Sequence, residues 1–165
     1  MTVHHVTIDQ FARILTRLDD KIQRAVVRGL QSAAMKLQGL VVTEIDRAEP
    51  HPAVDRGELR NSTKYERTEF GAILSMTAPH AGIMEYGARP FFPPTEPLAR
   101  WALRKGLADD EEEAQEVAYA IALHISQMGI EPRGYFIKSI QTLKHDGILA
   151  AEIRHELDAL ARSGR

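Results

Sequence analysis

Cysteine is missing from this 165-residue chain, which excludes disulfides, thiolate nucleophiles and cysteine-based metal centres. An excess of basic charge is missing too, since 21 lysines and arginines face 23 aspartates and glutamates. A protein that binds mainly through phosphate contacts usually carries such an excess or a concentrated basic face. What remains is a globular chain whose 44% hydrophobic residues can build a core without disulfides or metals.

Long apolar runs are also absent, so no stretch approaches the roughly 20 apolar residues of a membrane-spanning helix. The first ten residues lack the basic start and apolar stretch of a signal peptide. We therefore expect synthesis in the cytoplasm and no membrane association. Motifs of nucleophilic hydrolases, phosphate loops and dinucleotide-binding turns are missing as well, and neither a cofactor nor a metal is predicted.

Hydrophobic periodicity is the clearest signal that the sequence does contain. Apolar residues recur every three or four positions through residues 19–48, which predicts one long amphipathic helix. Alternation of apolar and polar residues predicts two short strands, at 63–68 and 72–78. Shorter helices are predicted at residues 9–18, 98–105, 110–128, 136–144 and 148–161. The expected fold class is α+β.

Breaker residues interrupt this pattern. Prolines 50 and 52 predict an exposed, mobile loop over residues 49–56, and residues 162–165 are expected to fray. Between Pro79 and Pro97, five prolines exclude a long helix or a central strand. With these interruptions, residues 1–165 are expected to form one domain.

The charged clusters fit helix ends better than metal sites. The acidic run Asp109–Glu113 lacks the alternating ligands and the glycine of a calcium loop, so we expect it at a helix N-terminus. Asp19 and Asp20 are predicted to cap the long helix. A hydrolase or nuclease would have to use His80, Glu85 or His124.

Two segments rich in glycine, proline and aromatic residues, 80–91 and 129–137, are the most distinctive. Gly87 permits a positive φ after a helical turn, and Pro90 then restricts the chain. The aromatic residues can anchor these loops to the core or to a neighbouring subunit, and both readings stay open. The predicted interface residues are Glu85, Tyr86, Gly87, Arg89, Phe91, Phe92, Arg133 and Tyr135.

In order along the chain, three elements resemble motifs of a known family. Asp55–Ser62 is similar to Thr-Gly-x-Leu-Arg-x-Ser, and His80–Gly87 to Tyr-Ala-x-x-x-Glu-x-Gly. Gly129–Phe136 is similar to Gly-x-x-Pro-Arg-x-Phe, with Gly134 in place of the usual proline. With a long helix before them and a helix pair after them, they resemble the tail-completion, or head–tail joining neck, proteins of long-tailed bacteriophages. This is the gene-product-ten-like family of lambdoid-type phages.

The resemblance implies a small α+β module in which a long N-terminal helix packs on a small antiparallel sheet, followed by C-terminal helices. It also implies a non-enzymatic virion protein that forms a ring at the neck or upper tail and helps the filled head to join the tail. The implied partners are further copies of itself, the head–tail connector or adaptor, the tail terminator and the tail tube proteins.

Because DNA passes through phage necks, transient contact with phage DNA is a further expectation. The residues predicted to face such a pore are Arg56, Arg60, Lys64 and Arg67, with Arg89 as an additional candidate. Two alternatives stay open: a tail terminator or minor tail protein, and, from a different class, a metal-dependent hydrolase or nuclease.

Overall fold

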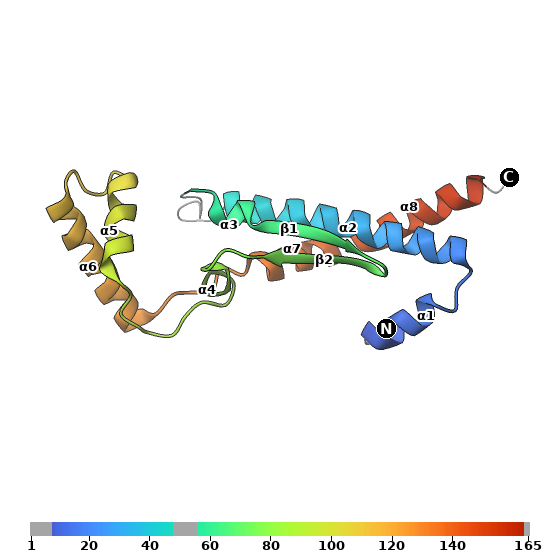
Figure 1. Ribbon diagram of the computed structural model, residues 1–165, viewed down its shortest axis with the longest axis horizontal. Helices are drawn as coiled ribbons and strands as arrows, with labels where there is room; N and C mark the ends of the chain where they lie inside the picture. The colour runs from blue at the N-terminus through green and yellow to red at the C-terminus, as the bar shows by residue number, and fades with distance from the viewer. Residues whose placement is uncertain (1–7, 48–55, 164–165) are drawn as a thin grey trace.

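The computed structural model describes residues 8–47 and 56–163, which form mostly helices and one two-stranded sheet (Figure 1). The helices are α1 (Ile8–Leu15), α2 (Asp20–Asp46), α3 (Glu58–Asn61), α4 (Ala81–Tyr86), α5 (Thr95–Arg104), α6 (Glu111–Met128), α7 (Tyr135–His145) and α8 (Ile148–Ser163). The strands β1 (Thr63–Thr68) and β2 (Gly71–Met76) pair antiparallel. The predicted α+β fold class, with its long N-terminal helix, small antiparallel sheet and C-terminal helices, is confirmed.

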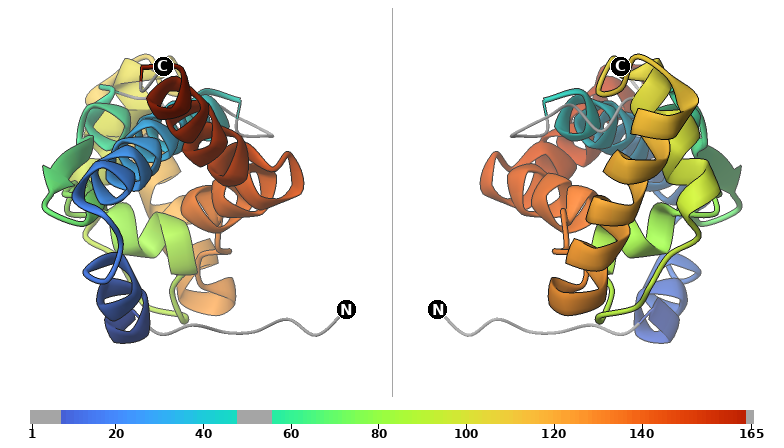
Figure 2. Two further views of the ribbon diagram at one scale, coloured as in Figure 1. Left: turned by 90° about the vertical axis from the view of Figure 1, so that its right-hand side faces the viewer. Right: turned by 90° about the vertical axis from the view of Figure 1, so that its left-hand side faces the viewer.

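Helix α2 is the element on which most of the molecule packs. The hairpin β1–β2 contacts it on one side, and α7 and α8 contact it on the other (Figure 2). Its apolar stripe supplies Val41 and Ile45 to the main core, both fully buried. The helix begins after Asp19, whose carboxylate accepts a hydrogen bond from the Lys21 N–H at 2.8 Å. The predicted cap is therefore confirmed at Asp19.

The hairpin shows the alternation that the sequence predicts. Residues directly opposite each other in the ladder share a face, and the pair Tyr65–Leu74 lies on the face with Thr63–Met76. Leu74 and Met76 pack against the buried cluster that includes Val41. The hairpin thus closes the main core from the side opposite α7.

Helices α5 and α6 form a separate hairpin, which we call the arm and define as residues 89–129. They pack on each other, make few contacts with the other described elements, and lie at one end of the long axis of the molecule (Figure 1). The buried residues between them are Ala99, Ala108, Ala114 and Ala118. Alanine lets two helices approach closely but buries little apolar surface. The orientation of the arm therefore depends on the contacts at its base.

Several boundaries differ from the sequence-based prediction: α1 ends at Leu15 instead of residue 18, and β2 ends at Met76 instead of residue 78. Helix α5 begins at Thr95 instead of residue 98, because Pro97 lies in the first turn, where an N–H is not needed for the helical ladder. Helix α8 continues through Ser163, so residues 162 and 163 are helical rather than frayed. Of the predicted loop at 49–56, residues 49–55 lie outside the described residues, as do residues 164 and 165 of the tail expected to fray. Within those residues, none of the helices is both long and apolar enough to cross a membrane.

The two glycines inside α2 offer a matched test of this packing. A Cβ at Gly29 would lie 2.6 Å from Cα of Ile153 in α8, whereas a Cβ at Gly39 would meet nothing within 4 Å. We expect Gly29→Ala to lower the free energy of unfolding by about 1–3 kcal/mol through overpacking. Gly39→Ala should raise it by about 0.5–1 kcal/mol. Urea unfolding of both variants measures the difference, and equal effects would contradict the close α2–α8 crossing.

Candidate functional site at the base of the arm

The carboxylate of Glu85 is buried at the start of α7, with 5% of the residue exposed. Its Oε2 accepts a hydrogen bond from the Phe136 N–H at 3.0 Å, and its Oε1 accepts one from the Ile137 N–H at 3.1 Å. These N–H groups belong to the first turn of α7, where no carbonyl of the helix itself is available to them. A negative charge is also favoured at this positive end of the helix dipole. Glu85 therefore ties α4 to α7.

Backbone hydrogen bonds strengthen the same junction. The Arg133 N–H donates to the carbonyl of Met84 at 2.8 Å, and the Gly134 N–H donates to the carbonyl of Glu85 at 3.2 Å. These bonds satisfy carbonyls at the end of α4 that have no partner within the helix. Gly134 has a φ of +63°, which proline cannot adopt. Glycine in place of the usual proline therefore matches the backbone of this chain.

The chain enters and leaves the arm through two segments that lie side by side, and we call this contact the crossing. Ala88 and Ile130 form an isolated antiparallel bridge, with N–H to carbonyl distances of 2.9 Å and 2.8 Å. Gly87 and Gly129 precede these residues and have φ values of +73° and +76°. A Cβ at Gly87 would collide with the Ile130 carbonyl oxygen, and one at Gly129 with that of Ala88. Both glycines are needed for conformation and for space.

Tyr135 and Ser139 bring polar atoms into the main core from α7. Both residues are buried, and neither hydroxyl has a hydrogen-bond partner among the described residues. Burial raises the pKa of the Tyr135 phenol above its usual value of 10.0, the positive charge of Arg133 opposes that rise, and the negative charge of Glu85 adds to it. The phenol is therefore neutral near pH 7 and contributes through packing.

The predicted interface residues divide into two groups. Glu85, Gly87, Arg133 and Tyr135 meet at the junction, where Glu85 and Tyr135 are buried. Burial leaves Glu85 and Tyr135 little surface for a subunit contact, so these two are corrected to residues that hold the fold together. Gly87 and Arg133 are half-buried, and their place at an interface stays a prediction. The exposed group is Tyr86 at the end of α4, which is 76% exposed, and Arg89, Phe91 and Phe92 at the start of the arm.

The four residues predicted to face a pore do not form one basic strip. Arg56, Lys64 and Arg67 are exposed, while Arg60 is partly buried, with its Nη1 3.4 Å from Oδ1 of Asp46. Lys64 and Arg67 lie on opposite faces of the hairpin, because positions separated by an odd number in a strand point in opposite directions. A single DNA-facing surface built from all four is not present in this conformation.

Sequence reasoning missed two surface features. One is the outer face of α6, where the ring of Tyr119 lies 5.9 Å from that of Phe92 at an angle of 58°. The sequence pattern that could have revealed this face is the four-residue spacing of Tyr119 and Leu123, away from the buried stripe that includes Ala114 and Ala118.

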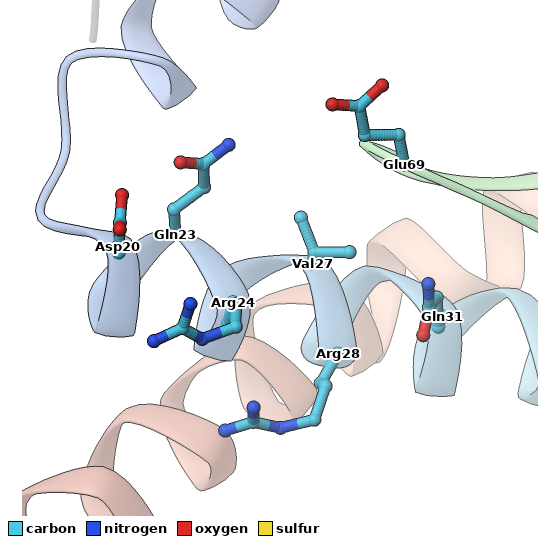
Figure 3. Close-up of a pocket in the computed structure, with 7 residues that line it drawn as sticks. All are labelled: Asp20, Gln23, Arg24, Val27, Arg28, Gln31 and Glu69. Carbon is cyan, nitrogen blue, oxygen red and sulfur yellow. The ribbon is translucent and has the colours of Figure 1, made fainter.

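The other missed feature is an open groove of about 540 Å³ along the first half of α2 (Figure 3). It is lined by Asp20, Gln23, Arg24, Val27, Arg28, Gln31 and Glu69. In Figure 3 Arg24 and Arg28 point away from Glu69, toward α8. Arg28 forms a salt bridge with Glu156 of α8, with 2.7 Å between Nε and Oε2. The groove has mixed charge and no nucleophile–base pair.

No catalytic or metal-binding constellation stands out among the residues that the structure describes. Within residues 8–47 and 56–163, no group of three or more histidine, aspartate or glutamate side chains could hold a metal ion. Comparisons with protein-family models, curated proteins and solved structures find no match. The family resemblance therefore stays a prediction, and function has to be inferred from the chain itself.

Removal of the Glu85 carboxylate should destabilise the junction. Glu85→Ala leaves two N–H groups of α7 without their charged acceptor, and we expect a loss of about 1.5–3 kcal/mol in the free energy of unfolding. Glu131→Ala, which removes an exposed carboxylate from the neighbouring segment, should change it by less than about 0.5 kcal/mol. Chemical denaturation of both variants measures this. Similar small effects would show that the Glu85 bonds do not support the fold.

The crossing can be tested with two glycines that share a positive φ. Gly106 has a φ of +66° but open space around it, so Gly106→Ala should cost only the conformational strain of about 1–2 kcal/mol. Gly129→Ala adds the collision with Ala88 and should cost about 1–3 kcal/mol more. Hydrogen exchange at the Ala88 and Ile130 amides should accelerate only in the Gly129 variant. Equal destabilisation without this local change would exclude the crossing.

Proposed function

We propose that this protein is a non-enzymatic virion subunit of the neck or upper tail of a long-tailed bacteriophage. In this role it forms a ring and takes part in joining the filled head to the tail. Its partners would be further copies of itself, the connector or adaptor, the tail terminator and the tail tube proteins.

One observation carries the proposal: the three family-like elements meet in a single core. Leu59 from the first, Ala81 from the second and Tyr135 from the third belong to the same buried cluster, together with Val41 and Ile45 of α2. The three elements, although separated in sequence, therefore contribute to one core, as the resemblance implies. Their convergence supports reading them as one architectural signature.

The work that the motif residues do also favours a structural role. Glu85 is the one acidic side chain of the second element, and both of its oxygens accept backbone hydrogen bonds. A general base needs a carboxylate that can reach a substrate proton. The engagement of Glu85 therefore weighs against the alternative of a metal-dependent hydrolase or nuclease that uses it.

A tail terminator or minor tail protein is the second candidate, because the same core would suit either. The position of the reading frame distinguishes them: a place between the connector and major tail genes supports the neck assignment. The arrangement gives DNA contact little support, since Lys64 and Arg67 lie on opposite faces of the hairpin.

Electron microscopy of particles assembled without the protein tests the neck role. We expect separate filled heads and tails, because the joining step lacks its subunit, and re-expression of the intact chain should restore joined particles. Normal infectious virions in the absence of the protein would refute the proposal.

A nuclease assay with added divalent metal provides the test of the enzymatic alternative. Activity that copurifies with the protein and disappears in a correctly folded Glu85→Gln variant would favour the enzyme over the virion subunit. Absence of activity in both preparations is the result we expect.

A further inference from the structure

Charge is distributed unevenly along the molecule although its net value is only -2. The tip of the arm, residues 105–116, carries six acidic residues and one basic residue, and all six acidic residues are exposed. The opposite end of the long axis contains α1, the start of α2 and the end of α8 (Figure 1). Within it, we call residues 13–28 the basic end. It carries five basic and two acidic residues. Arg28 is paired with Glu156 of α8, and the other four basic residues still outnumber Asp19 and Asp20. The arm tip and residues 13–28 therefore carry opposite net charge.

The outer face of α6 combines this acidic charge with apolar surface. Glu112, Glu116, Tyr119 and Leu123 follow one another at helical spacing on the side turned away from α5. Tyr119 is 58% exposed and Leu123 42% exposed, and Phe92 extends the surface beside Tyr119. All four side chains of this face are exposed in the part of the chain that the structure describes. Large apolar side chains grouped in this way are typical of interaction surfaces.

The basic end offers the complementary combination. Ile14 and Ile22 are exposed there, at 52% and 39%. Exposed basic residues lie around them in sequence: Arg13 on α1, Lys21 and Arg24 on α2, and Arg17 in the turn between the two helices. One end of the chain thus presents acidic and apolar residues, and the other presents basic and apolar residues.

We propose that the arm of one copy docks on the basic end of the next copy. The partner is a second copy of this chain, because the two complementary surfaces belong to the same molecule and lie too far apart along its axis to meet within it (Figure 1). A contact between two different surfaces repeats from copy to copy and produces a closed ring or a filament. The inference rests on the proposed ring-forming function and names the surface that builds the ring.

Charge reversal provides the test. The arm variant is Glu112→Lys with Glu116→Lys, and the end variant is Lys21→Glu with Arg24→Glu; all four positions are exposed, so folding should persist. Sedimentation equilibrium of the intact chain at low salt should show association that weakens as salt rises. Each variant alone should associate at least about tenfold more weakly, because like charges then face each other. Mixing the two variants should restore association, because each reversed surface meets its complement.

The matched control is Glu58→Lys with Glu66→Lys, which makes the same charge change at exposed positions outside the arm. Its association should equal that of the unmodified chain. Circular dichroism and thermal unfolding check that every variant is folded. If only the arm variant matters, the contact is arm to arm; if mixing fails to restore association, the surfaces are not complementary. Either result overturns the proposal.

If the chain remains monomeric at low salt and millimolar concentration, the docking proposal is also wrong. The same holds if the basic end binds another virion protein instead of a second copy. Particles assembled without the protein distinguish failure of the docking proposal from failure of the proposed function. If heads and tails stay separate without the protein but both charge variants restore joining fully, the docking inference is wrong and the neck role stands. If virions form normally without it, the neck role is wrong whatever the association measurement gives.

Discussion

The hydrogen bonds between the Glu85 carboxylate and the first turn of α7 are the interaction on which the rest of the architecture depends. They fix α4 against a helix that itself packs on α2, and they join residues 51 and 52 positions apart in the sequence. The chain between those positions is almost entirely the arm. Because the carboxylate and the Ala88–Ile130 bridge lie at the two points where the arm leaves and returns, its direction is set by groups in the core.

The arm itself contrasts with this junction. Its interior is built from alanine, which allows α5 and α6 to approach closely but provides little hydrophobic stabilisation. Leu98 and Leu103 pack against these alanines, whereas other large apolar residues, such as Tyr119 and Leu123, lie on the outside. This arrangement leaves apolar surface of the arm in contact with water. It suits an element that buries its outer face against another molecule.

Much of the local structure could be predicted from sequence, but the role of the candidate site could not. The Asp19 cap, the α6 start at an acidic run and the β1 boundaries follow from patterns within a few residues. Glu85 and Tyr135 were recognisable as distinctive residues, yet they were expected at an interface. Their burial depends on α4 meeting α7, and no local pattern reveals which distant backbone N–H groups a carboxylate will contact.

The sequence by itself therefore determined where helices and strands form and which glycines could adopt a positive φ. Helical periodicity, capping and β alternation act through hydrogen bonds and side-chain contacts between near neighbours. Only the tertiary structure decided that the segments at Gly87 and Gly129 approach each other closely, and that Glu85 binds the first turn of α7. It also decided that opposite charges stand at opposite ends of the molecule. These outcomes depend on packing between segments far apart in sequence, where space and orientation select the contacts.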